Sequence, residues 1–243
     1  MSIVTEHQVT LHRRACELLE KDLLEMSERL FVLEHWRDDA EQDKAPHGSF
    51  FTPFTLACEL SKEVYGTNII DLCAGIGALA FAVYHSTNPW CLTPAVTCVE
   101  INPAYAAVGR KVLPEATWIV GDVLDLSASF GNFDCAIASP PFGGAGQQGK
   151  SPRYRGSEFE YKVIDVARDF ADYGVYLLPQ SSVPFRYSGC LKYEPSPSGT
   201  YREFRDSTGL ELIFNCGIDT SLYRTDWRES FVASEIVCVN YQR

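Results

Sequence analysis

The segment FDCAIASPPFGG, residues 133–144, brings together residue types that could do chemistry at the end of a strand. Six mostly apolar residues lead directly into Ser139-Pro140-Pro141-Phe142. Neither proline has an N–H to give to a sheet ladder, so the strand must end there. The serine hydroxyl and the Pro140 carbonyl can then accept hydrogen bonds beside an aromatic ring. A tight turn with the phenylalanine packed underneath is the structural alternative.

A glycine-rich turn follows an earlier apolar strand in NIIDLCAGIGALA, residues 68–80. Gly75 and Gly77 would let the backbone approach a ligand, and a helix starting after them would present free N–H groups. Asp71, at the end of the strand, would repel a pyrophosphate lying on this turn. It suits a positively charged ligand group, such as an amino group or a sulfonium.

Two further acids stand at the ends of the next two apolar runs. Glu100 ends the run in VTCVEINP, where a carboxylate can accept hydrogen bonds from both hydroxyls of a ribose. Asp122 ends the run in WIVGDVLD, where an adenine amino group could donate to it. Each acid alone could equally be a helix cap or a turn residue. Three acids on successive strand ends beside one glycine turn predict a nucleoside with a cationic tail.

Alternating strands and helices are expected to position these residues. Such alternation is typical of βαβ units and a parallel sheet. Two strands near the end of the chain, 210–216 and 234–241, have no helix of comparable strength between them and are expected to close the sheet as an antiparallel pair. The other predicted strands are 68–73, 95–100, 117–120, 135–138 and 174–178, and the predicted helices are 78–85, 104–113 and 160–173.

Residues 5–36 are predicted to form one helix, followed by a polar linker, 38–46. Thr5 and Gln8 have the spacing of a capping box. Packing of its apolar stripe against the rest of the chain is favoured, and a homodimer contact is the alternative. The chain is therefore divided into an N-terminal helical extension with its linker, 1–45, and an α/β domain, 46–243. The stripe consists of Cys16, Leu19, Leu23, Met26, Leu30 and Leu33.

Composition narrows the class of protein. The net charge of −11 argues against a surface coated for nucleic acid, but residues 135–157 contain no acid at all. The nine cysteines form no CxxC pair and the five histidines show no metal-like spacing, so neither disulfides nor a metal site are predicted. No apolar stretch is long enough to span a membrane, and residues 1–8 lack the core of a signal peptide, which predicts a cytoplasmic protein.

In this order the motifs resemble those of the S-adenosylmethionine-dependent amino-methyltransferases, best known as DNA adenine-N6 and cytosine-N4 methyltransferases. The resemblance spans about residues 48–178 and implies a Rossmann-like fold, with a mostly parallel central sheet and S-adenosylmethionine as cofactor. It implies that Phe51 and Thr52, in GSFFTP, contact the methionine end of the cofactor. By the same resemblance Asp71, Gly75 and Gly77 contact that end, Glu100 the ribose and Asp122 the adenine.

The resemblance gives Ser139-Pro140-Pro141-Phe142 a catalytic role. An exocyclic amino group is a poor nucleophile because its lone pair is delocalised into the ring. Ser139 Oγ and the Pro140 carbonyl could each accept one of its N–H bonds and hold the nitrogen towards pyramidal geometry, with the prolines fixing the direction of that carbonyl. Phe142 would stack on the target base, after extrusion if the substrate is a duplex.

Motif order favours adenine N6 in DNA as the target, whereas a serine at the first motif position is common among cytosine-N4 enzymes. Adenine in RNA, a protein glutamine and a non-catalytic cofactor-binding partner subunit stay open as alternatives. Such enzymes often belong to restriction–modification systems. Two candidate substrate-binding loops are 143–160 and 181–205. In the first, Lys150, Arg153 and Arg155 are predicted on phosphates and Tyr154 on a base.

Overall fold

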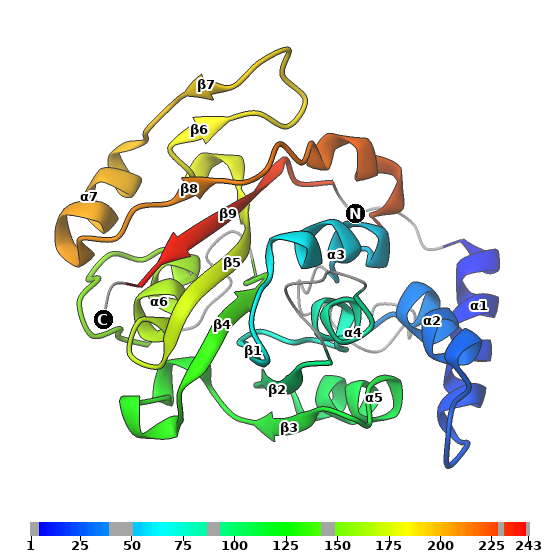
Figure 1. Ribbon diagram of the computed structural model, residues 1–243. Helices are drawn as coiled ribbons and strands as arrows, with labels where there is room; N and C mark the ends of the chain where they lie inside the picture. Colours follow the sequence, from blue (N-terminus) through cyan, green and yellow to red (C-terminus); the bar gives the residue numbers. More distant parts are fainter. Residues whose placement is uncertain (1–4, 39–50, 87–92, 142–148, 228–230, 242–243) are drawn as a thin grey trace.

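The computed structural model describes residues 5–38, 51–86, 93–141, 149–227 and 231–241, which form an α/β fold around a seven-stranded sheet (Figure 1). The strands lie in the order β3-β2-β1-β4-β5-β9-β8. The first five are parallel, and β9 is antiparallel to both of its neighbours. The strands are β1 (Asn68–Asp71), β2 (Ala95–Glu100), β3 (Thr117–Val120), β4 (Phe133–Ala138), β5 (Ala171–Pro179), β8 (Ile213–Phe214) and β9 (Ser234–Asn240).

This architecture confirms the predicted fold class, a mostly parallel sheet with two antiparallel strands from the end of the chain. The central strands read as continuous apolar runs because both of their faces are buried. Ile69 and Ile70 are adjacent on β1 and fully buried, yet they pack into separate cores on opposite faces of the sheet. The order of the strands reverses between β1 and β4, where ligands bind in folds of this type.

Helices cover both faces of the sheet (Figure 1). Side chains of α3, α4 and α5 belong to one core, and side chains of α6 and α7 belong to the other. A separate two-stranded pair, β6 and β7, precedes α7. The helices are α3 (Phe54–Leu60), α4 (Ala78–Tyr84), α5 (Pro103–Val112), α6 (Phe159–Ala167) and α7 (Gly199–Thr208); the pair is β6 (Phe185–Arg186) and β7 (Glu194–Pro195); the 3-10 turns are η1 (Ser61–Glu63), η2 (Val123–Asp125), η3 (Ala128–Phe130), η4 (Gln180–Ser182) and η5 (Thr220–Asp226).

The prediction of one helix over residues 5–36 is wrong, because two helices occupy this range: α1 (Glu6–Leu19) and α2 (Met26–His35). The predicted capping box of Thr5 and Gln8 is present at the start of α1. Residues 20–25 leave the helix, and this break lets Leu24 turn inward to 5% exposure. The apolar stripe is therefore not continuous: Leu23 and Met26 are exposed whereas Leu33 is buried.

The extension packs against the α/β domain, as the favoured interpretation expected. The Arg29 guanidinium of α2 contacts both carboxylate oxygens of Glu115 at 2.9 and 3.0 Å. Beyond α2, the Trp36 ring lies 5.8 Å from the rings of Phe51 and Tyr105. The homodimer stays a prediction, but the continuous stripe on which it rested is not present.

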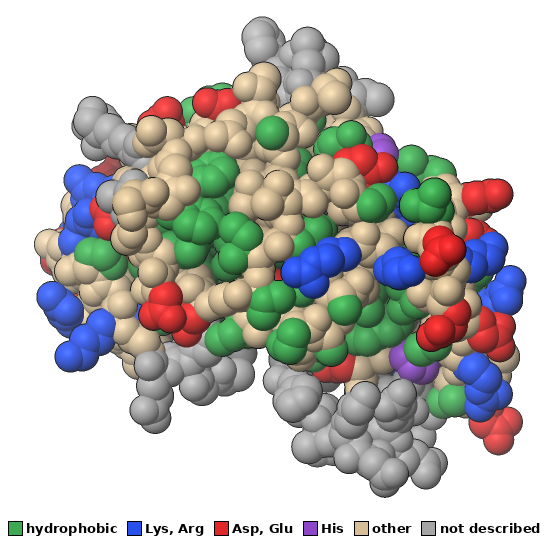
Figure 2. Space-filling model, turned by 90° about the horizontal axis from the view of Figure 1, so that it is seen from below, with side chains coloured by type: hydrophobic (Ala, Val, Ile, Leu, Met, Phe, Trp, Pro, Cys, Tyr) green, Lys and Arg blue, Asp and Glu red, His purple; other side chains and the backbone are tan. Residues whose placement is uncertain are grey.

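No helix in the described ranges is long and apolar enough to cross a membrane. The eight cysteines within those ranges are free thiols, and no group of His, Cys, Asp and Glu side chains there could hold a metal ion. Cys98, Cys135 and Cys238 are buried in the sheet. Seen from below, charged side chains gather towards the end where α1 and α2 lie and towards the opposite end, and much of the middle is uncharged (Figure 2).

Candidate active site

The glycine turn connects β1 to α4 through two left-handed backbone positions. Gly75 has φ +55° and Gly77 has φ +94°, a region that glycine adopts without steric cost. A Cβ at Gly75 would lie 3.4 Å from the Phe51 ring, and one at Gly77 would lie 3.2 Å from the Trp118 ring. The turn is thus closed tightly on both sides, which explains both glycines.

Asp71 ends β1 beneath this turn and is only 1% exposed. Neither carboxylate oxygen has a hydrogen-bond partner. Burial raises the pKa of Asp71 to about 7, although the backbone amides of Cys73 and Ala80 lie close enough to offset part of that effect. A buried acid without a partner is costly, so its position beside a ligand-type turn indicates a cationic ligand group.

Glu100 ends β2 and reaches across to the same turn. Its two carboxylate oxygens accept hydrogen bonds from the Gly75 N–H at 2.7 Å and from the Asn102 N–H at 2.8 Å. Burial raises the pKa of Glu100, and these amides counteract part of the rise. The structure therefore brings Glu100, Asp71 and the glycine turn into one site.

Asp122 follows β3 and caps the short turn η2, because its Oδ1 accepts a hydrogen bond from the Leu124 N–H at 2.9 Å. This is the capping role that the sequence left open as an alternative. The cap uses one of the two carboxylate oxygens of Asp122.

Sequence reasoning missed two apolar residues beside these acids. Ile101 and Val120 are 47% and 45% exposed at the carboxyl ends of β2 and β3. Ile101 directly follows Glu100, and Val120 lies two residues before Asp122. Exposed aliphatic side chains next to ribose- and adenine-type acceptors offer a surface for the face of a purine. Their place directly beside the two acids was the available signal.

Ser139 leaves β4 at the same edge of the sheet. β1 and β4 are paired with Asp71 opposite Ile137, two residues before Ser139. Ser139 lines one cleft together with Phe51, Thr52 and the glycine turn. Pro140 is buried and Pro141 is half-buried. Phe142 and positions 143–148 of the first candidate loop lie outside the described residues.

The basic residues of this loop do not form one surface. Lys150 and Arg155 are exposed. Arg153 instead turns inward: its guanidinium pairs with Asp165, at 3.0 Å, and with Asp169. The Asp165 side chain is fully buried, so Arg153 anchors the loop, which disfavours its predicted contact with a phosphate.

Tyr154 is buried to 1% exposure, and its ring packs against Tyr161 and Phe204 at 5.4 and 5.8 Å. Its hydroxyl donates to Glu158. The Tyr154 ring is therefore part of the core, which disfavours its predicted stacking on a base. The second candidate loop, 181–205, contains β6, β7 and the first turns of α7.

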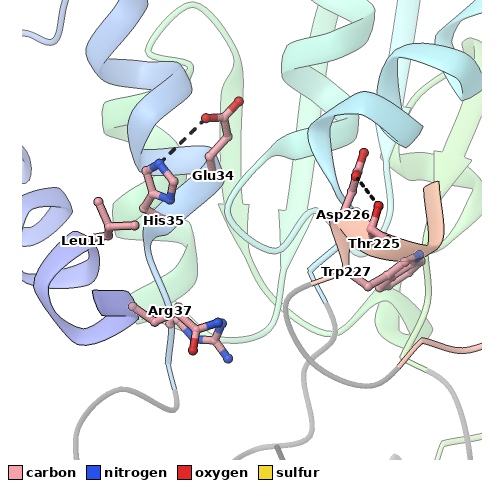
Figure 3. Close-up of a pocket in the computed structure, with 8 residues that line it drawn as sticks. Leu11, Glu34, His35, Arg37, Thr225, Asp226 and Trp227 are labelled. Atoms are coloured by element: carbon pink, nitrogen blue, oxygen red, sulfur yellow. Dashed lines mark hydrogen bonds and ion pairs between the residues drawn. The ribbon is translucent and has the colours of Figure 1, made fainter. Parts of the chain in front are cut away.

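A second cavity, of about 220 Å³, lies between the N-terminal extension and the end of η5 (Figure 3). Leu11, Glu34 and His35 lie on one side, and Thr225, Asp226 and Trp227 on the other. Its lining includes neither Ser139 nor any of the three acids at the strand ends. The cavity is therefore separate from the site built around the glycine turn.

No protein-family model and no curated protein matches the sequence. Among solved structures, the fold is similar to that of a Vibrio vulnificus protein assigned as the modification subunit of a type I restriction enzyme (TM-score 0.59, 10% identity, covering 91% of this chain and 51% of that one). It is similar to a Listeria monocytogenes protein assigned as a class I S-adenosylmethionine-dependent methyltransferase (TM-score 0.58, 11% identity, 91% and 69%).

A third similar structure is the methyltransferase subunit of a type I restriction-modification system from Streptococcus thermophilus (TM-score 0.54, 15% identity, 90% and 51%). The chain spans about half the length of the two restriction-system proteins. At these identities the likeness concerns the fold. Together with the strand order and the glycine turn, it shows that this chain has the Rossmann-like fold of the S-adenosylmethionine-dependent methyltransferases.

Proposed function

We propose that this protein is an S-adenosylmethionine-dependent methyltransferase that methylates an exocyclic amino group, with N6 of adenine in DNA as its target. The observation that carries the proposal is the shared cleft of Ser139, Phe51, Thr52 and the glycine turn, with Asp71 buried and unpartnered beneath it. Ser139, which can accept a hydrogen bond from an N–H group, thus lies at the same edge of the sheet as the proposed site for a cationic nucleoside.

The residues of the site fit the cofactor. Asp71 would face its positively charged methionine end, and Phe51 and Thr52 would line that end. Glu100 and Asp122 would accept hydrogen bonds from the ribose and the adenine amino group, with Ile101 and Val120 against the purine. When bound, S-adenosylmethionine supplies a methyl group on a sulfonium, whose sulfur takes the bonding electron pair as the methyl group leaves.

Ser139 and Pro140 would do the positioning on the substrate side. The Ser139 Oγ and the Pro140 carbonyl oxygen each accept a hydrogen bond from one N–H of the target amino group. These two hydrogen bonds turn the lone pair of the amino nitrogen towards the methyl group. Both acceptors are held by the end of β4 and by two prolines with restricted backbones. Proximity and orientation, not a strong base, would then provide most of the rate. Once the new N–C bond has formed, the nitrogen carries a positive charge, and one of its two N–H bonds gives up its proton to solvent water.

Transfer of tritium from labelled S-adenosylmethionine tests the proposal. The purified protein is offered double-stranded DNA, single-stranded DNA, RNA and a nuclease-treated cell extract, and labelled polymer is digested to nucleosides. Label in N6-methyladenine of DNA is the expected result. Label in N4-methylcytosine, in RNA or only in protein would each replace the proposed target, and cofactor binding without any transfer would favour a non-catalytic partner subunit.

A double variant tests the catalytic assignment. Ser139→Ala together with Phe142→Ala should abolish turnover and leave the affinity for S-adenosylmethionine nearly intact, as measured by calorimetry. Asp125→Asn, an exposed acid beyond the candidate site, is the matched control and should leave both quantities unchanged. Residual turnover of the double variant equal to that of the wild type would refute the mechanism.

A further inference from the structure

Helix α5, which lies beside β3 (Figure 1), contains a glycine in its interior. Glycine is a poor helix former, so Gly109 needs a reason for its place. A Cβ at Gly109 would lie only 2.0 Å from Cη2 and 2.4 Å from Cζ2 of the Trp118 ring on β3. Glycine is therefore required here because any side chain would displace this ring from α5.

The same edge of the Trp118 ring faces the glycine turn. A Cβ at Gly77 would lie 3.2 Å from the same two ring atoms, Cη2 and Cζ2. The Trp118 indole N–H donates to the carbonyl oxygen of Leu113, the residue that caps the end of α5, at 3.1 Å. This hydrogen bond and the close packing both attach Trp118 to α5, so the helix sets the position of the ring against Gly77.

A second contact of α5 reaches the turn through Phe51. The Tyr105 ring lies edge-to-face against the Phe51 ring, with 5.2 Å between the ring centroids and 71° between the planes. Tyr105 is buried, and its hydroxyl donates to Asp38. The Phe51 ring lies 3.4 Å from the position of a Cβ at Gly75, and it lines the cleft that contains Ser139. Tyr105 therefore fixes a ring that forms a wall of the cleft.

Tyr105 and Gly109 are four residues apart, so they lie on one face of α5. Through the rings of Phe51 and Trp118, this face supports both glycines of the turn. Neither Tyr105 nor Gly109 is among the described residues that line the cleft. An effect of either residue on a ligand in the cleft must therefore pass through these two rings.

We propose that Tyr105 and Gly109 are positioning residues for S-adenosylmethionine. They hold the Phe51 and Trp118 rings in place, and these rings hold the glycine turn against which the cofactor binds. This inference rests on the proposed function, since it needs the cofactor to bind at that turn. A turn that is already held in its binding conformation loses less conformational freedom when the ligand arrives. The packing of α5 thus contributes to cofactor affinity as well as to the stability of the fold.

The alternative is that this face of α5 serves core packing alone. Variants would then lose stability but, once folded, would bind the cofactor like the wild type. The two possibilities can be separated because Trp118 is only partly buried and belongs to β3, an edge strand of the sheet. Its ring has room to shift when a methyl group is added at Gly109, so the affinity of the folded variant can be measured.

Calorimetric titration of Gly109→Ala with S-adenosylmethionine tests the contact through Trp118. The variant should bind about tenfold more weakly, because the added methyl group moves the ring from its place against Gly77. Adding Trp118→Phe to Gly109→Ala should restore most of the lost affinity, since the smaller ring leaves room for the methyl group. Gly199→Ala is the matched control, because a Cβ at this position in α7 would meet open space, and it should leave the affinity unchanged.

Two variants of Tyr105 test the contact through Phe51. Tyr105→Leu removes the ring and should weaken binding of S-adenosylmethionine about fivefold. Tyr105→Phe keeps the ring and should stay within about twofold of the wild type. Tyr65→Leu is the control, because it removes a ring contact with Tyr173, 4.5 Å between centroids, that lies before β1 and at the start of β5. It should leave the affinity unchanged, whatever urea unfolding shows for its stability.

Wild-type affinity in Gly109→Ala or in Tyr105→Leu, with only the stability lowered, would overturn the positioning role of that residue and leave the proposed function standing. Equal losses of affinity in Tyr105→Phe and Tyr105→Leu would overturn the role of the ring. The two Tyr105 variants decide the question if Gly109→Ala does not fold. No binding of S-adenosylmethionine by the wild type would refute the proposed function, and the positioning role with it.

Discussion

Asp71 at the end of β1 and the pair Arg153 and Tyr154 after β4 are treated by the fold in opposite ways. Asp71 is buried with no hydrogen-bond partner, whereas Arg153 has two carboxylates and Tyr154 has a carboxylate and two aromatic rings. A polar group that the fold buries and leaves unpaired indicates a ligand. Arg153 and Tyr154, whose side-chain partners lie within the fold, have a structural role in this loop.

The largest expected effect of the unpaired Asp71 is on how the free energy of unfolding depends on pH. The pKa of Asp71 is about 7 in the folded protein and about 3.9 in an unfolded chain. Between these values the folded state keeps a proton that the unfolded state has lost, so stability falls as pH rises from about 4 to 7, by at most about 4 kcal/mol. Urea unfolding at pH 5 and pH 8 should show this fall in the wild type and a smaller one in Asp71→Asn. Equal falls in both proteins would contradict it.

The next effect concerns the cofactor. Asp71→Asn should weaken binding of S-adenosylmethionine by about 100-fold, because it removes the buried charge that faces the cationic end of the ligand. Asp122→Asn, whose side chain still can cap η2, should weaken binding less than tenfold. Calorimetric titration measures both. If the two variants lose affinity equally, the contrast between an unpaired and a capping carboxylate is of no consequence for binding.

A smaller effect is expected in the loop after β4. Burial raises the pKa of Asp165, but the Tyr154 and Arg153 amides and the Arg153 side chain outweigh burial and hold it below its usual range. Arg153→Ala should therefore lower the free energy of unfolding by about 2 kcal/mol, less than for a fully buried pair because these amides remain. Arg155→Ala should change it by less than about 0.5 kcal/mol. Chemical denaturation compares them, and equal stabilities would refute the anchor role.

The smallest expected effect is on the salt dependence of DNA binding, which distinguishes Arg153 from Lys150 and Arg155. Lys150→Ala with Arg155→Ala should reduce the slope of log affinity for DNA against log salt by about 2 and weaken binding about tenfold, since both side chains are exposed. Arg153→Ala should leave the slope unchanged. Fluorescence anisotropy at several salt concentrations measures it. A slope that falls only in Arg153→Ala would reverse the assignment.

Sequence was a good guide wherever local pattern and burial agree. β2 and β3 have the predicted limits; Glu100 ends β2 and reaches the glycine turn, and Asp122 follows β3. Residue type and spacing were sufficient there because the carboxyl ends of parallel strands share one edge. The orphaned state of Asp71 could not be predicted, since it depends on which amides surround it in three dimensions.

The features that the sequence did not predict depend on contacts between residues that are distant in the chain. Arg153 looked available because residues 135–157 contain no acid, but its partners, Asp165 and Asp169, are supplied by α6 and the turn after it. The break between α1 and α2 interrupts a segment of good helix formers, because tertiary packing of Leu24 outweighs local propensity. The seven-residue helix α3 was missed because it is too short to show a period in sequence and, unlike the equally short α4, has no glycine turn before it to mark its start.

The aromatic contacts of Trp36 bear on how this chain can evolve. Trp36 comes from the segment after α2, Tyr105 from α5 and Phe51 from the segment before α3, and the Phe51 ring also limits the space above Gly75. The N-terminal extension therefore packs against the same ring, Phe51, that lies beside the glycine turn. Recombination that exchanged the first 38 residues for those of another lineage would have to exchange Tyr105 and Phe51 with them. The helical extension is thus coupled to the α/β fold through these rings.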